Sequence, residues 1–209
     1  MIKLPVSISI PISDKSIRAL HVGDSVLLNG VILTCRDVAH KWIYDRFIKK
    51  IIKPTSEDKE VIEELKDLLH GSLIYHCGPV VSGLDTGDYK FISAGPTTSI
   101  REEPYQSDII SHFKLKGVIG KGGMGDRTLE ACIQTPAVYF HTVGGAAALI
   151  ARSVKKVLGV HKLEFGSTEA IWIIQVNNFP VVVTMDSFGK SLHKKVLENS
   201  RLMLDRLIR

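Results

Sequence analysis

The chain has 209 residues, of which 44% are hydrophobic and 23% are charged, proportions typical of a globular protein and unlike those of a disordered chain or a coiled-coil rod. Its 27 Lys and Arg exceed its 22 Asp and Glu by a net charge of +5, an excess too modest to require a nucleic-acid partner. The longest nearly apolar stretch, residues 137–151, is interrupted by polar residues and glycines and is shorter than the roughly 20 residues of a membrane span, and no secretory signal is evident, so we expect a soluble cytoplasmic protein.

The first third of the chain alternates strand and helix patterns. Val6–Ile10 alternates apolar and polar residues as a half-buried strand does, and Ser13 or Asp14 can cap a short helix through Leu20. Asn29-Gly30 accepts positive φ at both turn positions and therefore predicts a hairpin between two short apolar runs, Asp24–Leu28 and Val31–Thr34. A helix then begins at Arg36, with an apolar stripe formed by Ala39, Trp42, Ile43, Phe47 and Ile51.

The rest of the chain continues this alternation, which is typical of an α/β fold. A helix capped by Thr55 or Ser56 extends to His70, and the glycine-rich segment 77–95 predicts a long irregular loop. The remaining predicted elements are strands 73–76, 117–119 and 137–140, helices 127–134 and 146–157, a hairpin of 171–176 with 181–185, and an amphipathic helix over about 190–207 whose basic residues form a solvated face. We expect one domain over residues 1–209.

The segment from Gly95 to Arg101 holds the densest group of candidate functional residues. A Gly-Pro turn precedes Thr97, Thr98 and Ser99, and the arginine follows. Free backbone N–H groups at a turn that enters a helix bind oxyanions, hydroxyl groups add donors, and an arginine holds a carboxylate through two parallel hydrogen bonds. The same hydroxyl run is also an ordinary helix cap, so both interpretations stay open on spacing alone.

Two further cations follow predicted strands. Lys121 lies in a glycine-rich turn that is not a Walker P-loop, because Gly122 rather than Ser or Thr comes after the lysine. Arg36 has Asp37 and His40 beside it. These two side chains also suit structural roles, the aspartate as a helix cap and the histidine as a satisfied core residue.

The three cations share one position in the predicted topology. Arg36, Arg101 and Lys121 lie where strands give way to helices, the side of an α/β sheet at which ligands usually bind. Three converging cations suit a small dicarboxylate better than a nucleic-acid duplex, which needs many basic residues spread over a surface. We therefore expect an anion-binding site that takes no nucleic acid.

Six segments, taken in order, resemble the C-terminal part or separate β subunit of class I fumarate hydratases and the β subunit of L(+)-tartrate dehydratases. The specific ones are Arg-Asp-x-x-His at 36–40, Gly-Pro-Thr-Thr-x-x-Arg at 95–101 and the Gly-Lys-Gly turn at 120–122. The others are Ile74–Pro79, Val143–Ala147 and Glu169–Trp172. The resemblance covers nearly the whole chain.

The resemblance implies a swivelling β/β/α domain, similar to the mobile domain of aconitases, that closes over a [4Fe–4S] cluster carried by a partner α subunit in a hetero-oligomer. The implied activity is reversible hydration of fumarate to (S)-malate, with tartrate dehydration as the nearest alternative. By the same resemblance, Arg36, Arg101 and Lys121 bind the substrate carboxylates and Thr97 transfers a proton. Supporting positions are Asp37, His40, Gly95, Thr98 and Gly122.

The three cysteines invite the question of whether this chain itself holds a cluster. Cys35, Cys77 and Cys132 stand far apart with no C-x-x-C pair, a usage that fits a reducing compartment and no disulfide framework. Three thiolates are enough to bind a [4Fe–4S] cluster with one open iron, but the spacing does not support it. We expect buried cysteines that act as small hydrophobic residues, and no metal ligands in this chain.

The chain departs from the family pattern beside the candidate site. Cys35 stands where glycine is common, and Glu102-Glu103-Pro104-Tyr105 replaces the usual Met-Asp-Ser-Tyr-like continuation after Arg101. Two inward-pointing acids would weaken an anion site, so we expect both glutamates to face outward along the helix. A non-catalytic anion-binding module or a weak nucleic-acid binder is the alternative from a different functional class.

Overall fold

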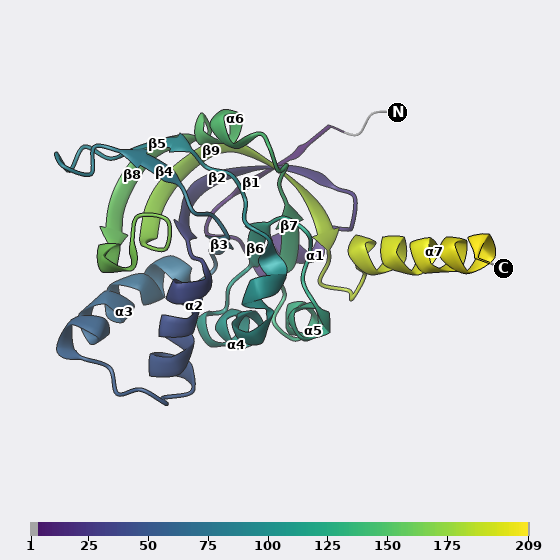
Figure 1. Cartoon of the computed structure of the whole chain (residues 1–209), viewed down its shortest axis with the longest axis horizontal. Helices are drawn as coiled ribbons and strands as arrows, with labels where there is room; N and C mark the ends of the chain where they lie inside the picture. Colours follow the sequence, from purple (N-terminus) through teal and green to yellow (C-terminus); the bar gives the residue numbers. More distant parts are fainter. Residues whose placement is uncertain (1–3, 209) are drawn as a thin grey trace.

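The computed structural model describes residues 4–208 as a mixed α/β structure, with a strongly curved sheet above a group of helices (Figure 1). Seven strands form the sheet in the order β1-β2-β3-β6-β7-β9-β8, and an additional antiparallel pairing joins β2 to β9. These pairings close a ring through β2, β3, β6, β7 and β9. The strands are β1 Val6–Ser9, β2 Ser25–Thr34, β3 Leu73–Tyr75, β6 Gly117–Gly120, β7 Val138–His141, β8 Val154–His161 and β9 Ile171–Met185.

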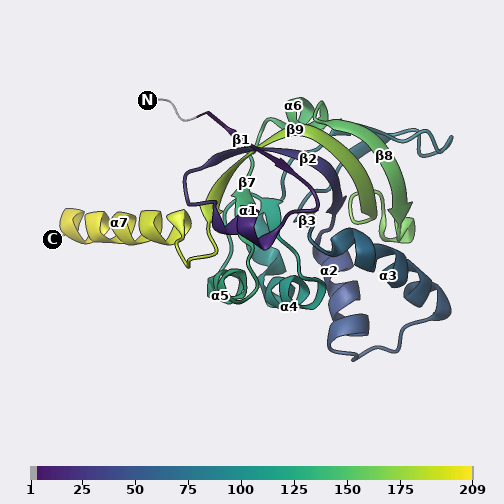
Figure 2. The ribbon, with the colours of Figure 1, turned by 180° about the vertical axis from the view of Figure 1, so that it is seen from behind.

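Helices α2, α3, α4 and α5 lie together below the sheet in Figure 1, and the view from behind shows the same arrangement (Figure 2). α2 continues into a π-helical turn, and a short 3₁₀ turn leads into α4. The helices are α1 Asp14–Arg18, α2 Asp37–Ile43 with its π turn Tyr44–Ile48, α3 Ser56–Leu69, α4 Glu103–Phe113 after the 3₁₀ turn Ser99–Glu102, α5 Asp126–Gln134, α6 Ala147–Ala151, a 3₁₀ turn Leu163–Phe165, and α7 Leu192–Leu207.

The sheet buries apolar residues on both of its faces. Successive side chains of a strand point to opposite faces. In β3, Leu73 and Tyr75 join the cluster inside the curved sheet, whereas Ile74 joins the cluster between the sheet and the helices. Within the inner cluster, the Tyr75 ring meets the Phe179 ring edge-on at 5.2 Å between centroids. Burial on both faces explains why the parallel strands read as short continuous apolar runs.

β2 runs unbroken from Ser25 to Thr34, so the predicted hairpin at Asn29-Gly30 is wrong. Gly30 has a φ of +129°, and a Cβ atom there would lie 2.9 Å from the Ile10 Cβ atom. The glycine therefore allows a strand irregularity and a close approach of the chain rather than a turn. A dipeptide suited to a hairpin turn also suits a bulge.

β9 likewise continues through Asn177–Pro180, so the second predicted hairpin is also wrong. The Asn178 N–H donates to Asn29 Oδ1 over 2.9 Å, and Leu28 pairs with Phe179 in the β2–β9 ladder. The two irregular segments thus face each other across one ladder. Asn29 and Asn178 are 149 positions apart, which is why local turn patterns do not indicate this pairing.

Two other segments differ from the predictions. Within 77–95, the strands β4 Val80–Ser82 and β5 Lys90–Ser93 pair as a hairpin, so the segment is not wholly irregular. The helix predicted over 146–157 ends at Ala151, and the chain then enters β8. Pairing of β8 with β9 outweighs the local helical pattern there, as tertiary context commonly does for short segments.

The predicted helix capped by Thr55 is present as α3, and the final predicted helix is α7. The Thr55 hydroxyl accepts from the Asp58 N–H over 3.1 Å and the Asp58 carboxylate accepts from the Thr55 N–H over 3.0 Å, which forms a capping box. α7 projects away from the remaining elements in both ribbon views. Among residues 4–208, no helix is long and apolar enough to cross a membrane.

Candidate functional site

The carboxyl ends of the parallel strands β2, β3 and β6 lie next to one another and supply the candidate site. Arg36 follows β2, Gly78 follows β3 and Lys121 follows β6. The Gly-Pro-Thr-Thr segment crosses these ends: the Thr97 N–H donates to His76 O over 2.7 Å and the Lys121 N–H donates to Thr97 O over 3.3 Å. Backbone hydrogen bonds thus place three separate loops at one edge of the sheet.

These loops surround an open cavity of about 500 Å³. Its lining consists of the three predicted cations and the Gly-Pro-Thr-Thr segment, together with one glycine that sequence reasoning did not single out as a site residue: Arg36, Gly78, Gly95, Pro96, Thr97, Thr98, Arg101 and Lys121. A Cβ atom at Gly78 would lie 2.5 Å from Arg36 Nη1. Glycine at that position therefore makes room for the guanidinium group.

Two of the three cations have acidic partners. Arg101 Nη2 donates to Thr97 Oγ1 over 2.6 Å and lies 3.4 Å from Asp37 Oδ1. Arg36 Nη1 lies 3.3 Å from the Glu169 carboxylate. In the part of the chain that the structure describes, no carboxylate lies within ion-pair distance of Lys121 Nζ. An anion in this cavity would meet one uncompensated cation and two that its neighbours hold in place.

A buried chain of hydrogen bonds lies behind the cavity. His40 Nε2 and His76 Nε2 lie within hydrogen-bonding distance of Gln106 Oε1, at 2.9 Å and 2.8 Å. The Tyr139 hydroxyl donates to Ser99 Oγ over 2.9 Å, and Ser99 Oγ also contacts His76 Nδ1 at 2.9 Å. The chain ends at Arg36 O, 2.9 Å from His40 Nδ1, and at the Gly123 N–H, which donates to Tyr139 over 3.3 Å.

This network joins the loops that carry the cations, and the structure gives His40 a buried structural position within it. Sequence reasoning singled out Ser99 only as part of the hydroxyl run and missed His76, Gln106 and Tyr139. A signal for Gln106 was present, because it shares the i, i+3, i+4, i+7 face of α4 with Ile109, Ile110 and Phe113, all of them buried. A polar residue on an apolar helix face must find a buried partner.

Burial lowers the pKa of both histidines in this network. The pKa of His76 falls to about 3 because of burial and the neighbouring His40 ring, and burial lowers the pKa of His40. Unfolding would expose both rings to water, where an imidazole has a pKa of about 6.5. The unfolded chain therefore binds more protons than the folded chain below that pH.

We expect each of these histidines to lower the free energy of unfolding by up to about 1.4 kcal/mol per pH unit as the pH drops below about 6.5. Urea unfolding of the full chain between about pH 8 and pH 5 measures this slope. His76→Asn should show a shallower slope than the wild type, whereas replacing the exposed His70 by Asn should leave it unchanged. A slope for His76→Asn that equals the wild-type slope would contradict the buried neutral state of His76.

An alanine at Gly120 should destabilise the folded chain by about 3 kcal/mol. Its Cβ atom would lie 1.9 Å from Ser99 Oγ and 3.1 Å from the Tyr139 hydroxyl, so the buried network would have to break or the strand would have to move. Gly159→Ala is the matched control, since its Cβ would first meet Ile173 Cδ1 at 3.6 Å. Equal midpoints for the two variants in denaturant unfolding would disprove the close packing described here.

The two glutamates after Arg101 do not face outward, so that expectation is wrong. Glu102 is fully buried, and burial together with the nearby Asp37 carboxylate raises its pKa to about 9. The Glu103 carboxylate accepts from the Gly125 N–H over 2.8 Å and from the Thr128 hydroxyl over 2.6 Å, at the amino end of α5. Both acids bind neighbouring elements that lie far away in the sequence.

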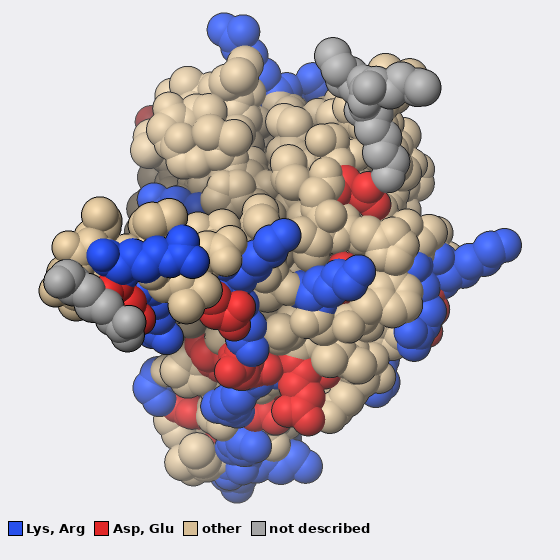
Figure 3. Space-filling view, turned by 90° about the vertical axis from the view of Figure 1, so that its right-hand side faces the viewer, with Lys and Arg blue, Asp and Glu red and all other residues tan. Residues whose placement is uncertain are grey.

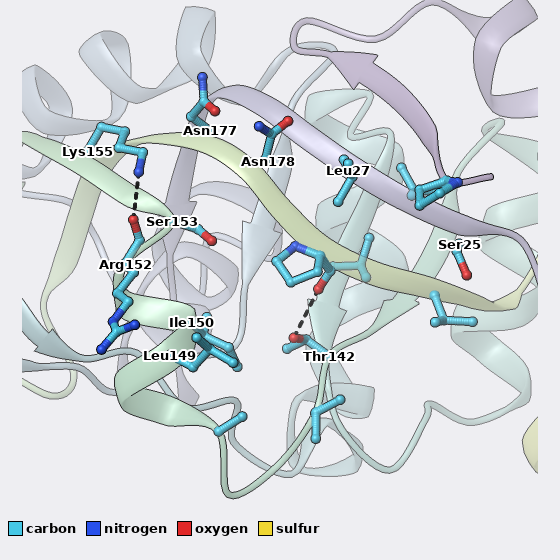
Figure 4. A pocket seen from close by; sticks show the side chains of 17 residues that line it. Ser25, Leu27, Thr142, Leu149, Ile150, Arg152, Ser153, Lys155, Asn177 and Asn178 are labelled. Atoms are coloured by element: carbon cyan, nitrogen blue, oxygen red, sulfur yellow. Dashed lines mark hydrogen bonds between the residues drawn. The ribbon is translucent and has the colours of Figure 1, made fainter.

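A second cavity, of about 580 Å³, is lined by residues of α6, β2 and β9 and of the segments beside them (Figure 4). Its lining is mostly apolar, with Leu27, Leu149 and Ile150 among the side chains drawn. Lys155 Nζ donates to the carbonyl oxygen of Arg152 over 2.8 Å, so this cation is engaged with the backbone. The cavity lined by three cations suits a dianion better than this one.

The cysteines lie in the core and do not suit a metal cluster. Cys35 and Cys132 belong to the cluster between the sheet and the helices, whereas Cys77 belongs to the cluster inside the curved sheet. Burial raises the pKa of Cys77 and of Cys132 to about 12, and raises that of Cys35 as well. Cluster ligation requires thiolates, and three buried thiols on two sides of a sheet do not fit an iron–sulfur cluster.

Comparisons with known proteins identify the family to which this chain belongs. The family model described as "Fumarase C-terminus" matches residues 3–196. The protein named "Putative fumarate hydratase class I" of Geobacillus stearothermophilus is 44% identical over 195 residues, which cover 93% of this chain but 35% of that protein. The chain thus spans about a third of that relative.

Relatives of similar length are also found. The "Putative L(+)-tartrate dehydratase subunit beta" of Methanocaldococcus jannaschii is 37% identical over 199 residues, which cover 94% of this chain and 95% of that subunit. The L(+)-tartrate dehydratase subunit beta of Escherichia coli is 34% identical over 198 residues, covering 94% and 89%. With a family match over most of its length and relatives of this identity and coverage, the chain belongs to the fumarase C-terminal family.

Proposed function

We propose that this chain is the β subunit of a hydro-lyase that reversibly hydrates fumarate to (S)-malate. The observation that carries the proposal is the cavity whose lining brings together Thr97 and three cations, Arg36, Arg101 and Lys121. Two carboxylates need two cationic contacts, and the third cation can hold the negative charge that develops when a C–H bond beside a carboxylate breaks. Supporting positions are Asp37 and His40 on α2, and Gly95, Thr98 and Gly122 in the loops.

Thr97 is the proposed proton-transfer residue. Its Oγ1 accepts a hydrogen bond from Arg101 Nη2 over 2.6 Å, which leaves the hydroxyl hydrogen of Thr97 available to the substrate. The Arg101 guanidinium group also stabilises the negative charge on Thr97 Oγ1 after the hydroxyl proton has been transferred. An unassisted threonine hydroxyl is a poor base, and this contact supplies part of the activation it needs.

We further propose that a [4Fe–4S] cluster is held by a partner α subunit in a hetero-oligomer. The burial of all three cysteines in this chain supports placing the cluster in the partner. The cation-lined cavity at the carboxyl ends of β2, β3 and β6 is open, so a partner can reach it. In this proposal residues 1–209 form one swivelling β/β/α domain, similar to the mobile domain of aconitases, that brings its cations over the partner's cluster. Three cysteines in the reduced, buried state support a cytoplasmic location.

Dehydration of L(+)-tartrate is the second candidate activity. Its support is chain length, because the β subunits named for tartrate dehydratase match nearly end to end, while the fumarate hydratase relative is longer. Malate and tartrate differ by one hydroxyl group, and the cations of the cavity would hold either dicarboxylate. The identity to the fumarate hydratase relative, 44% against 37% and 34%, favours fumarate.

A nucleic-acid-binding role receives less support. Figure 3 shows the face from which α7 projects, where basic and acidic side chains are mixed rather than arranged as a basic stripe. Duplex binding needs phosphate contacts spread along a surface. A non-catalytic anion-binding module remains the alternative that the assay below tests.

The test is anaerobic co-expression with a candidate α chain, iron–sulfur reconstitution, and absorbance assays with malate and with tartrate. The α chain alone is the matched control. Turnover of malate that requires both chains supports the proposal, and preferential turnover of tartrate selects the second activity. A cluster-containing complex that turns over neither acid would leave another hydroxy-dicarboxylate as substrate, and failure to form a complex would favour the anion-binding module.

A further inference from the structure

Two carboxyl groups from different elements meet behind Arg101. Glu102 ends the 3₁₀ turn before α4, and Asp37 is the first residue of α2. Each carboxyl group shifts the pKa of the other, upward for Glu102 and downward for Asp37. Glu102 is fully buried, and in residues 4–208 no N–H or O–H group of another residue donates to either of its oxygens. Two carboxylates cannot bond to each other unless one of them carries a proton.

The surrounding charges decide which carboxyl group holds that proton. Arg101 lies beside Asp37, and Arg36, itself paired with Glu169, also acts on Asp37. Although burial opposes ionisation, the hydrogen bond from Glu102 and the two arginines lower the pKa of Asp37. The other titratable groups that Glu102 influences are the buried Cys35 thiol and Tyr139 hydroxyl, and burial keeps both of them uncharged at neutral pH.

The contacts form one sequence from the buried acid to the cavity. Glu102 and Asp37 act on each other's ionisation, Asp37 Oδ1 lies 3.4 Å from Arg101 Nη2, and Arg101 Nη2 donates to Thr97 Oγ1 over 2.6 Å. We propose that Glu102 is a positioning residue that acts as a neutral acid: it donates its proton to Asp37, and Asp37 holds the Arg101 guanidinium against Thr97. The inference rests on the proposed function, in which Arg101 binds a substrate carboxylate.

Loss of the Glu102 proton would change the charge behind the arginine. A negative charge on the buried Glu102 would repel the partly exposed Asp37 carboxylate and compete with the substrate for Arg101. The effect should fall on substrate binding more than on the chemical step, so that KM rises while kcat changes less. A glutamine in place of Glu102 keeps an N–H donor toward Asp37 but has no proton to lose.

The experiment compares the wild-type assembled enzyme with Glu102→Gln from about pH 7 to about pH 10. The matched control is Glu60→Gln, which removes the same charge from an exposed position of α3. We expect the wild-type and Glu60→Gln KM to rise about tenfold one pH unit above the titration of Glu102, and the Glu102→Gln KM to stay level. Superimposable KM profiles for the wild type and Glu102→Gln would overturn the proposal.

A second measurement separates this proposal from the proposed function. A group whose pKa is raised on folding stabilises the folded state at low pH, and this contribution is lost as the pH rises toward about 9. In unfolding of the full chain, the wild type should therefore lose stability relative to Glu102→Gln between about pH 5 and pH 9. A constant difference overturns the proposal. Inactivity of the wild-type complex at every pH would count against the proposed function, and the unfolding comparison would then decide the Glu102 assignment by itself.

Discussion

Replacing Arg101 by alanine should lower kcat/KM of the assembled enzyme about a thousandfold. Its guanidinium group lines the cavity and is aligned by Thr97 and Asp37. The variant would lose a charge-assisted contact to a substrate carboxylate and would leave the Thr97 oxygen without its donor. Steady-state kinetics with malate over a range of concentrations measures the loss, which should include a large increase in KM.

Two variants test whether the loss comes from this site. Arg101→Lys keeps the charge but loses the planar guanidinium group, which can make two parallel hydrogen bonds to a carboxylate. It should therefore recover only part of the activity. Arg127→Ala removes the same charge from α5, where the arginine makes a long 3.4 Å contact to Ser107 Oγ and lies outside the cavity lining. Full activity of Arg101→Ala, with an unchanged unfolding midpoint, would reject the role of Arg101 in substrate binding.

Removing the Thr97 hydroxyl should lower kcat about a hundredfold or more, the usual range for loss of a positioned proton-transfer group. Thr97→Val keeps the shape of the side chain and removes the oxygen that accepts from Arg101. Rapid-quench or steady-state measurement of kcat at saturating malate is the direct readout. A solvent isotope effect that disappears in the variant would support proton transfer at this atom.

Thr97→Ser is the matched comparison, because it restores the hydroxyl group and should recover most of the turnover. If Thr97 served only to align Arg101, Thr97→Val would raise KM and leave kcat intact. That split in the kinetic constants distinguishes proton transfer from orientation of the arginine.

The positions of two of the cations could be predicted because each follows a strand closely. Arg36 and Lys121 come immediately after apolar runs, and parallel pairing of β2, β3 and β6 brings such positions to one edge. Helix caps were equally local, as Thr55 shows. Where a feature depends on neighbours in sequence and on one sheet rule, sequence reasoning identified it.

Features that depend on distant partners could not be predicted in the same way. Asn29-Gly30 has the composition of a turn, but its strand continues because β9 pairs with it across the irregularity. Glu102 follows a cation and precedes a helix, a place that favours solvent exposure, yet it is fully buried and the Asp37 carboxylate on α2 shifts its pKa. In both cases the deciding contact comes from a segment that local patterns do not include.

The buried histidine network has a consequence for motion. It fastens the loops after β2 and β3, the start of α4 and the Gly123 turn to one another through side chains that are all inaccessible to water. Loops held in this way need little ordering when a ligand arrives, so the entropic penalty of binding is small. Any closure over a partner would therefore carry the cavity as one rigid body, and the flexing would take place in the connections outside it.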